Sequence, residues 1–219
     1  MLHGDFHMHT YFSSDCMVDP SDLVARCTEV GLNCIAVTDH NSLKGALAVK
    51  AIAPFTVITG EEVRTTEGEI TALFISEEIP KGLTPLETVK QIKSQGGLVS
   101  IPHPRDPFRS SPLTRSGVED VIPYADIVEA FNARVTLPHH NSRGRQLAKE
   151  FNLLSTAVSD AHTLPELGRS YTELPEFDET PEGFKDALLQ ARLVERPANP
   201  IVHVYSTINK LRHKFFHIP

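Results

Sequence analysis

Asp5-Phe6-His7-Met8-His9-Thr10 follows a short apolar opening, and the fold can be argued outward from this stretch. Leu2 to His9 predicts a strand, and side chains two apart on a strand point to the same face. His7 and His9 are therefore expected to lie together, with imidazoles close enough to hold one metal ion. The pair alone does not establish a metal site, because two exposed histidines on a strand are common.

Helix and strand signals alternate along the rest of the chain. Asp19-Pro20 and Thr84-Pro85 have the cap-then-proline pattern that begins helices, and Gly31 follows the first of them. Further helices are predicted at 42–53, 138–152 and 180–193. Short apolar strands are predicted at 33–38, 55–59, 69–75, 98–101, 126–131 and 155–158. About seven strands separated by helices favour a small α/β barrel over an open sheet.

Composition bounds the classes of protein that remain. A chain of 219 residues suits one domain, and its net charge of −7 disfavours coating of a polyanion while permitting a local phosphate pocket. The three cysteines form no CxxC pair, which favours a reducing compartment. Neither a signal peptide nor an apolar run of membrane-spanning length is evident. We therefore expect a cytoplasmic protein with no membrane partner, and no protein partner is predictable from the sequence.

Side chains of the types that bind metals recur where the predicted strands end. They are His7, His9, Asp39, His40, Glu62, His103, Asn132, Asp160 and His162. Active sites of α/β barrels are built at the C-terminal ends of strands, so the set predicts a metal-binding rim, although each residue alone has an ordinary reading as a cap or turn residue. Imidazole and carboxylate without thiolate suit Zn, Mn or Fe(II). One ion cannot use all these ligands, and two or three ions are expected.

Four motifs in chain order resemble those of the PHP (polymerase and histidinol phosphatase) superfamily. They are Asp5–Thr10 with Ser13-Ser14-Asp15, Thr38-Asp39-His40-Asn41, Ile101-Pro102-His103-Pro104 and Ser159-Asp160-Ala161-His162. The resemblance implies a distorted seven-stranded (β/α)7 barrel with its metal site at the strand C-termini. It also implies a single domain over 1–219, with a core of about 1–165 and a packed extension of about 166–219. Glu166-Leu167-Gly168 and Tyr171-Thr172-Glu173 resemble the extension of the stand-alone phosphoesterase group.

The resemblance also implies which residues would hold each ion. The first ion would be held by His7, His9, Glu62 and Asp160, the second by Asp15, His40 and His162, and the third by His103 with Glu62 as a bridge. Glu62 is preferred to Glu61 because Gly60-Glu61-Glu62-Val63 resembles the family's Gly-x-Glu pattern. Many members place a histidine where this chain has Glu69, a harder and more anionic ligand. The count of ions therefore stays open between two and three.

The implied function is metal-dependent hydrolysis of a phosphomonoester of a small metabolite or nucleotide. A metal-bound hydroxide would attack phosphorus, supported by His40, Asp160 and His162. Phosphate-binding candidates are Arg134, Asn132, Arg105 and Arg109, because guanidinium pairs well with phosphoryl oxygens. Three alternatives remain open: a 5′-to-3′ exonuclease acting on short oligonucleotides, a C–N hydrolase, and a non-catalytic metal-bound regulatory module. The basic tail, residues 201–219, is expected to pack across the body with its charged groups solvated.

Overall fold

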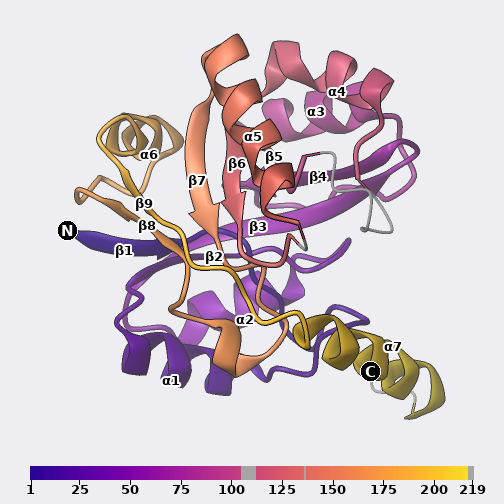
Figure 1. Ribbon diagram of the computed structural model, residues 1–219, viewed down its shortest axis with the longest axis vertical. Coiled ribbons are helices and arrows are strands. Elements are labelled where there is room, and N and C mark those ends of the chain that lie inside the picture. The colour runs from indigo at the N-terminus through magenta and orange to yellow at the C-terminus, as the bar shows by residue number, and fades with distance from the viewer. Residues whose placement is uncertain (105–111, 136, 217–219) are drawn as a thin grey trace.

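The computed structural model of the chain describes residues 1–104, 112–135 and 137–216 (Figure 1). One mixed sheet forms the centre, with the spatial order β7-β6-β5-β4-β3-β2-β1-β8-β9. Its strands are β1 (Leu2–Asp5), β2 (Cys34–Val37), β3 (Thr56–Thr65), β4 (Gly68–Leu73), β5 (Leu98–Ile101), β6 (Ile127–Asn132), β7 (Leu154–Val158), β8 (Tyr171–Leu174) and β9 (Arg192–Val194).

β7, at one end of the strand order, comes back to β1, so that the sheet is nearly a closed barrel. The chain beyond β1 pairs in parallel with the chain beyond β7 through a Met8–Ala161 bridge. Asp160 N–H donates to the His7 carbonyl at 2.8 Å, and His9 N–H donates to the Ala161 carbonyl at 2.9 Å. The residues just past these two strands are therefore held side by side.

The expected seven-stranded (β/α)7 arrangement is not what the sheet contains. Nine strands are described, and β4 and β8 run antiparallel to their neighbours. The β3–β4 hairpin turns at Gly68, whose φ of 126° is open mainly to glycine. Arg192 and Leu193, expected as the end of a helix, lie in strand β9, and β8 pairs with β1 in the part expected only as an extension.

Helices cover the two faces of the sheet. They are α1 (Pro20–Val30), α2 (Lys44–Ile52), α3 (Pro85–Ser94), α4 (Arg115–Val121), α5 (Pro138–Phe151), α6 (Pro181–Leu188) and α7 (Val202–Phe216). Asp19 caps α1, Gly31 follows it in the left-handed conformation, and Thr84 forms a reciprocal capping box with Glu87 on α3. Helices α1 to α5 pack on one face of the curved sheet, where they share a single apolar cluster with alternate strand residues, and Phe184 of α6 packs on the other face. Figure 1 shows α1 and α2 below the sheet and α3, α4 and α5 above it to the right.

The apolar core lies between the sheet and these helices. All four residues of β2 are buried, as expected for a strand covered on both faces. A second cluster packs Phe6 edge-on against Phe184 of α6, with ring centroids 4.8 Å apart. Cys16, Cys27 and Cys34 are buried, and none of the three is in a disulfide. Among the helices described, none combines the length and the hydropathy that crossing a bilayer requires.

Candidate metal centre

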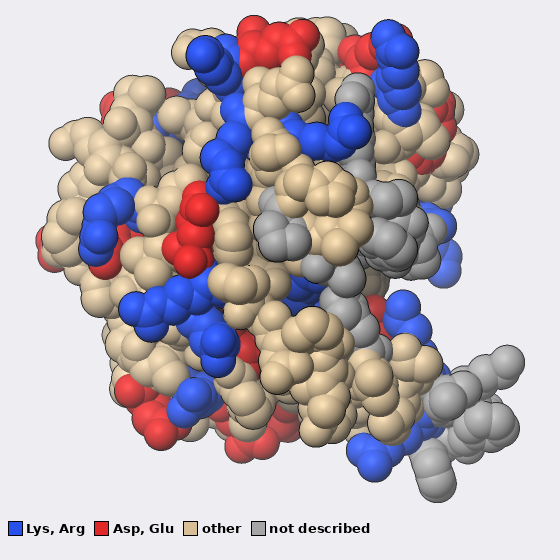
Figure 2. All heavy atoms as spheres, in the orientation of Figure 1, with Lys and Arg blue, Asp and Glu red and all other residues tan. Residues whose placement is uncertain are grey.

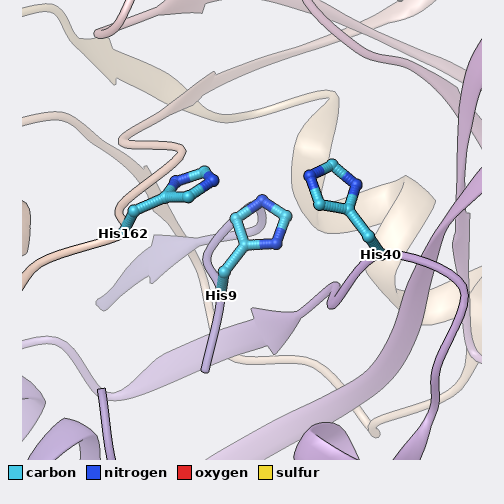
Figure 3. Close-up of side chains that lie close together, drawn as sticks. All are labelled: His9, His40 and His162. Carbon is cyan, nitrogen blue, oxygen red and sulfur yellow. The ribbon is translucent and has the colours of Figure 1, made fainter. Parts of the chain in front are cut away.

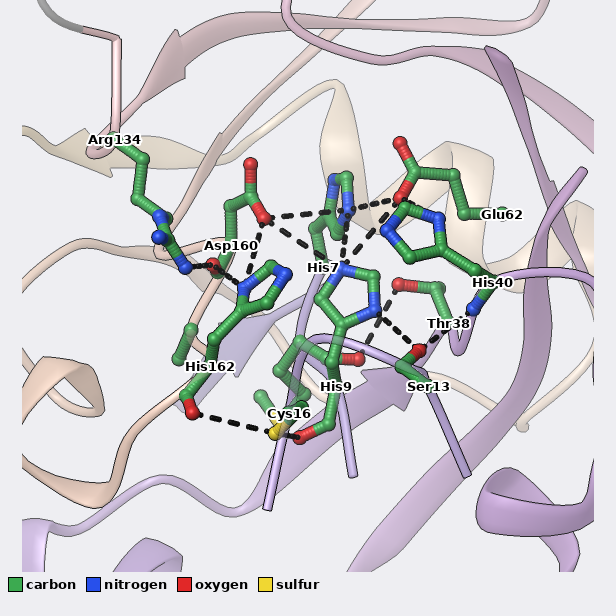
Figure 4. A network of polar contacts seen from close by, with 12 residues as sticks. His7, His9, Ser13, Cys16, Thr38, His40, Glu62, Arg134, Asp160 and His162 are labelled. Carbon is green, nitrogen blue, oxygen red and sulfur yellow. Dashed lines mark hydrogen bonds and ion pairs between the residues drawn. The ribbon is translucent and has the colours of Figure 1, made fainter. Parts of the chain in front are cut away.

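Polar side chains lie close together at one edge of the sheet. They come from the C-terminal ends of β1, β2, β3, β5, β6 and β7 or from the residues that follow these strands. The structure ends β1 at Asp5, so His7 and His9 lie on its extension rather than within the strand. His40 follows β2 and forms an isolated bridge with Glu62 of β3. Figure 4 shows imidazoles and carboxylates from these separate segments turned toward one another.

Four donor atoms form the most compact part of the centre, which we call the inner group (His7, His9, Glu62 and Asp160). His7 Nε2 lies 3.1 Å from His9 Nε2 and 3.2 Å from Glu62 Oε2. Asp160 Oδ1 lies 3.5 Å from His9 Nε2 and 3.7 Å from His7 Nε2. Ligands about 2.1 Å from one ion lie roughly 3.0–3.4 Å from each other. The two shorter distances fall within this range and the two Asp160 distances slightly exceed it, so the spacing is close to that of a coordination shell.

Asp15, His40 and His162 meet beside the inner group. Asp15 Oδ2 lies 3.4 Å from His40 Nε2 and 3.4 Å from His162 Nε2. His9 stands between the two other imidazoles, with ring centroids 4.2 Å from His162 and 4.7 Å from His40 (Figure 3). Burial opposes the charge of Asp15, yet the flanking histidines lower the pKa of its carboxyl overall. Within the described ranges, Asp15 Oδ1 is buried with no hydrogen-bond partner, as a ligand atom would be.

Glu62, Glu69 and His103 form a third cluster, which we call the outer group. Glu62 Oε1 lies 2.9 Å from His103 Nε2, while its Oε2 faces the inner group, so Glu62 stands between the two clusters. Glu69 Oε1 is 3.9 Å from His40 Nδ1 and only 3.3 Å from an Arg64 guanidinium nitrogen. Glu69 thus occupies the position expected of it, but it already has a cationic partner.

Electrostatics in the inner group distinguish its two histidines. Burial lowers the pKa of His7, but carboxylates led by Asp160 and Glu62 outweigh it, and the pKa rises well above its usual value. Burial and neighbouring imidazoles lower the pKa of His9 to about 3. His9 is therefore neutral at physiological pH, the form in which histidine binds metals. Burial opposes ionisation of Glu62, but the surrounding imidazoles hold its pKa well below the usual range.

The donor set fits divalent metal ions. Five buried carboxylates converge here: Asp15, Glu62, Glu69, Glu129 and Asp160. Buried carboxylates are costly without positive charge, and histidines bound to a metal supply none, because they bind as neutral imidazoles. Ions held by the inner group and by Asp15, His40 and His162 would neutralise this charge. The ligand types suit Zn, Mn or Fe(II) alike.

Glu129 is a central residue that sequence reasoning missed. Its Oε1 lies 2.5 Å from His7 Nδ1, and its Oε2 accepts hydrogen bonds from His103 N–H at 2.6 Å and Asn132 Nδ2 at 2.8 Å. A carboxylate behind a ligating histidine fixes the tautomer and orientation of the ring. The available signal was a lone carboxylate inside an otherwise apolar strand, Ile127–Asn132. Ser13 supports His9 in the same way, with its Oγ 3.1 Å from His9 Nδ1.

The residues expected to bind phosphate have different surroundings in the structure, and those that are described already have hydrogen-bond partners within the protein. Asn132 is buried and donates to Asp160 Oδ2 at 3.0 Å, so it steadies an inner-group ligand. Arg134 is only 4% exposed, and its guanidinium donates to backbone and side-chain oxygens described below. Arg105 and Arg109 lie outside the described residues. One cation of the basic tail does reach the centre: Lys210 Nζ lies 3.4 Å from Asp15 Oδ2.

The site and the sheet define a metal-binding α/β protein whose ligands come from separate strand ends. The family model described as the PHP domain matches residues 5–104, and the one described as PHP-associated matches residues 138–193. This chain belongs to the PHP family.

Two curated relatives are uncharacterised proteins of Methanocaldococcus jannaschii. One is 37% identical over 145 residues, which are 60% of this chain and 82% of the relative. The other is 31% identical over 178 residues, which are 80% of this chain and 71% of the relative.

Solved structures share the fold at low sequence identity. One is a two-domain protein of Bacteroides vulgatus, which is named as containing a predicted PHP-like metal-dependent phosphoesterase. Its TM-score is 0.69 at 19% identity. The match covers 89% of this chain, which spans 65% of that protein. A protein of Bifidobacterium adolescentis, provisionally assigned as a metal-dependent phosphoesterase, has a TM-score of 0.62 at 18% identity, covering 90% and 97%. An amidohydrolase of Chromobacterium violaceum, with bound sulfate and no metal, has a TM-score of 0.60 at 14% identity, covering 93% and 96%.

Proposed function

We propose that this protein is a metal-dependent phosphoesterase that hydrolyses a phosphomonoester of a small metabolite or nucleotide. The observation that carries the proposal is the inner group, four donor atoms at 3.1–3.7 Å, joined through Glu62 to further ligands on both sides. The family membership and the assigned activities of two structural neighbours support the same class of reaction.

The protein's own residues prepare the site for such a reaction. His7, His9, Glu62 and Asp160 would hold one divalent ion, and Asp15, His40 and His162 a second. Ions bound there would supply Lewis acidity and would lower the pKa of bound water toward neutrality, which is the chemistry that hydrolysis of a phosphoester needs. Glu129 and Ser13 keep the ring nitrogens of His7 and His9 turned toward the ligand positions. Burial of the inner group excludes bulk water from these atoms.

The surface favours a small substrate over a long polyanion. Figure 2 shows Lys and Arg side chains scattered over one face with Asp and Glu between them, without a continuous basic track among the coloured residues. The net charge of −7 points the same way. A short oligonucleotide with a terminal phosphate remains a competing substrate for the same site. The sulfate-bound amidohydrolase neighbour makes a C–N bond a second competing target.

The test is a substrate panel on protein loaded separately with Mn, Zn and Fe(II). Sugar phosphates and nucleoside monophosphates are assayed for released phosphate, beside 5′-phosphorylated oligonucleotides and N-acyl substrates. The proposal expects phosphate release that chelator abolishes and that Asp160→Asn lacks. Oligonucleotide digestion or amide hydrolysis without monoester turnover would overturn it in favour of a competing reaction. No turnover of any substrate would favour the non-catalytic module.

A further inference from the structure

Helix α7 presents one face to the metal centre. Val202, Ser206 and Lys210 are four residues apart, so they follow one another along a single helix face. Val202 is buried, whereas Val204 and Ile208 on the opposite side are exposed. Figure 1 shows α7 extending from the body on the side toward which the β6 and β7 arrows point. The face that carries Lys210 is therefore the one directed at the strand ends.

Arg134 fastens this face to the centre. One terminal guanidinium nitrogen donates to the Asp160 carbonyl at 3.4 Å. The other donates to the Val202 carbonyl at 3.2 Å and to Ser206 Oγ at 2.7 Å. The buried Arg134 guanidinium therefore links Asp160, a predicted ligand residue, to α7. We call these three hydrogen bonds the clamp. Arg134, the expected phosphate-binding residue, is thus engaged by the protein itself.

Lys210 is the cation that this clamp brings to the site. Its Nζ lies 3.4 Å from Asp15 Oδ2, although its side chain is 54% exposed. The ammonium therefore stands at the mouth of the centre, touching a predicted metal ligand while facing solvent. Phosphomonoesters carry charge on oxygens that metal ions do not all neutralise, and a lysine ammonium binds such oxygens as a point charge.

We propose that Lys210 binds the phosphoryl group of the substrate and that Arg134 is the positioning residue that holds Lys210 there. The inference rests on the proposed phosphoesterase function and assigns the phosphate-binding role to the C-terminal helix. A different reading of the same contact is that Lys210 only fills the place of a cation beside Asp15. The two readings predict opposite changes when the charge is removed.

The experiment titrates inorganic phosphate into Mn-loaded protein by calorimetry and counts bound Mn in parallel. Lys210→Met should weaken phosphate binding about tenfold or more, as loss of a charge-assisted hydrogen bond does, with Mn stoichiometry unchanged. Lys210→Arg should stay within about threefold of the wild type. Arg212→Met removes the same charge from an exposed position on α7 and should leave phosphate binding unchanged.

Three results would contradict the inference in different ways. Unchanged phosphate affinity in Lys210→Met would overturn it while leaving the proposed function intact. Tighter Mn binding with unchanged phosphate affinity would show that Lys210 competes with metal. Wild-type protein that neither binds phosphate nor releases it from monoesters would overturn the proposed function together with this inference.

The positioning role of Arg134 has a separate test that spares the buried guanidinium. Ser206→Ala removes one acceptor of the clamp from α7. Phosphate binding should weaken about threefold in the wild-type background and should not change further in Lys210→Met. Equal weakening in both backgrounds would show a general structural effect and overturn the positioning role.

Discussion

The inner group and the outer group share Glu62 but differ in how their ligands are held. The inner donors are buried, and hydrogen bonds with Glu129, Ser13 and Asn132 fix the orientation of His7, His9 and Asp160. In the outer group, Glu69 has Arg64 as an ionic partner, and 46% of the Arg64 side chain is exposed. The inner group is therefore organised to hold a cation, whereas the Glu69 carboxylate is already paired with the Arg64 guanidinium and is less available to a metal ion. We expect two tightly bound ions and a weaker third at the outer group.

The largest expected effect comes from removing an inner-group charge. Asp160→Asn keeps the shape of the side chain and takes away an anionic ligand beside His7 and His9. Metal affinity at the inner group should fall by more than about 100-fold, beyond the range typical of outer-shell partners. Metal content measured by mass spectrometry checks this, with circular dichroism as the folding control. Full metal content in Asp160→Asn would show that the inner group is not a metal site.

Next in size is the loss of the carboxylate behind His7. Glu129→Gln turns an amide toward His7 Nδ1 and removes the charge that orients the ring. Metal affinity should fall about 10–100-fold. Metal titration against a competing chelator measures the change. The matched control is Glu119→Gln on exposed α4, which should bind metal like the wild type. If Glu129→Gln and Glu119→Gln bind metal with equal affinity, Glu129 does not orient His7 for metal binding.

Glu61 and Glu62 show the same contrast within one strand. Both are buried on β3, but burial raises the pKa of Glu61 to about 7, whereas imidazoles lower that of Glu62. A carboxyl whose folded pKa is raised binds extra protons in the folded state, so stability falls as pH rises from about 4.5 to 7. The Glu61→Gln variant should not lose stability over this pH range, because its amide does not titrate. The amide oxygen can still accept the hydrogen bond from Ile79 N–H.

The expected gain from Glu61→Gln is at most about 3 kcal/mol at pH 8, with little change at pH 4. Urea unfolding at the two pH values, on chelator-treated protein, checks it. A variant that is equally destabilised at both would show that the amide cannot be accommodated and that the carboxyl titration is not what matters.

The smallest expected effect is at the outer group. Glu69→Ala should leave the two tightly bound ions in place. It should lower the affinity for the weaker third ion about fivefold, because the Glu69 carboxylate is already paired with Arg64. Stepwise Mn titration resolves the separate binding events. Loss of a tight ion in Glu69→Ala would erase the distinction between the two groups.

Most of the expected ligands could be picked out from the sequence because they follow recognisable strands and have metal-binding side chains, whereas Asp15 and Glu69 were expected only from the family resemblance. His7, His9, His103 and Asp160 needed only strand ends and their chemistry. Lys210 and Arg134 needed tertiary contacts: α7 lies far along the chain from Asp15, and no local pattern shows which residues its face meets.

The strand count was wrong for a related physical reason. β8 and β9 are short, and their stability comes from pairing with β1 and with each other rather than from a strong local pattern. The helix expected to run to Leu193 ends at Leu188, and the last residues of that expected helix form β9. Local propensity alone does not reveal such pairing.

Anomalous diffraction from a crystal of Mn-soaked protein is the sharpest test of the inner group as the principal metal site. We expect strong anomalous peaks among His7, His9, Glu62 and Asp160 and among Asp15, His40 and His162. We expect a weaker peak between Glu69 and His103. If the strongest peak lies at Glu69 and His103, or if no peak lies among the inner donors, the inner group is not the principal metal site.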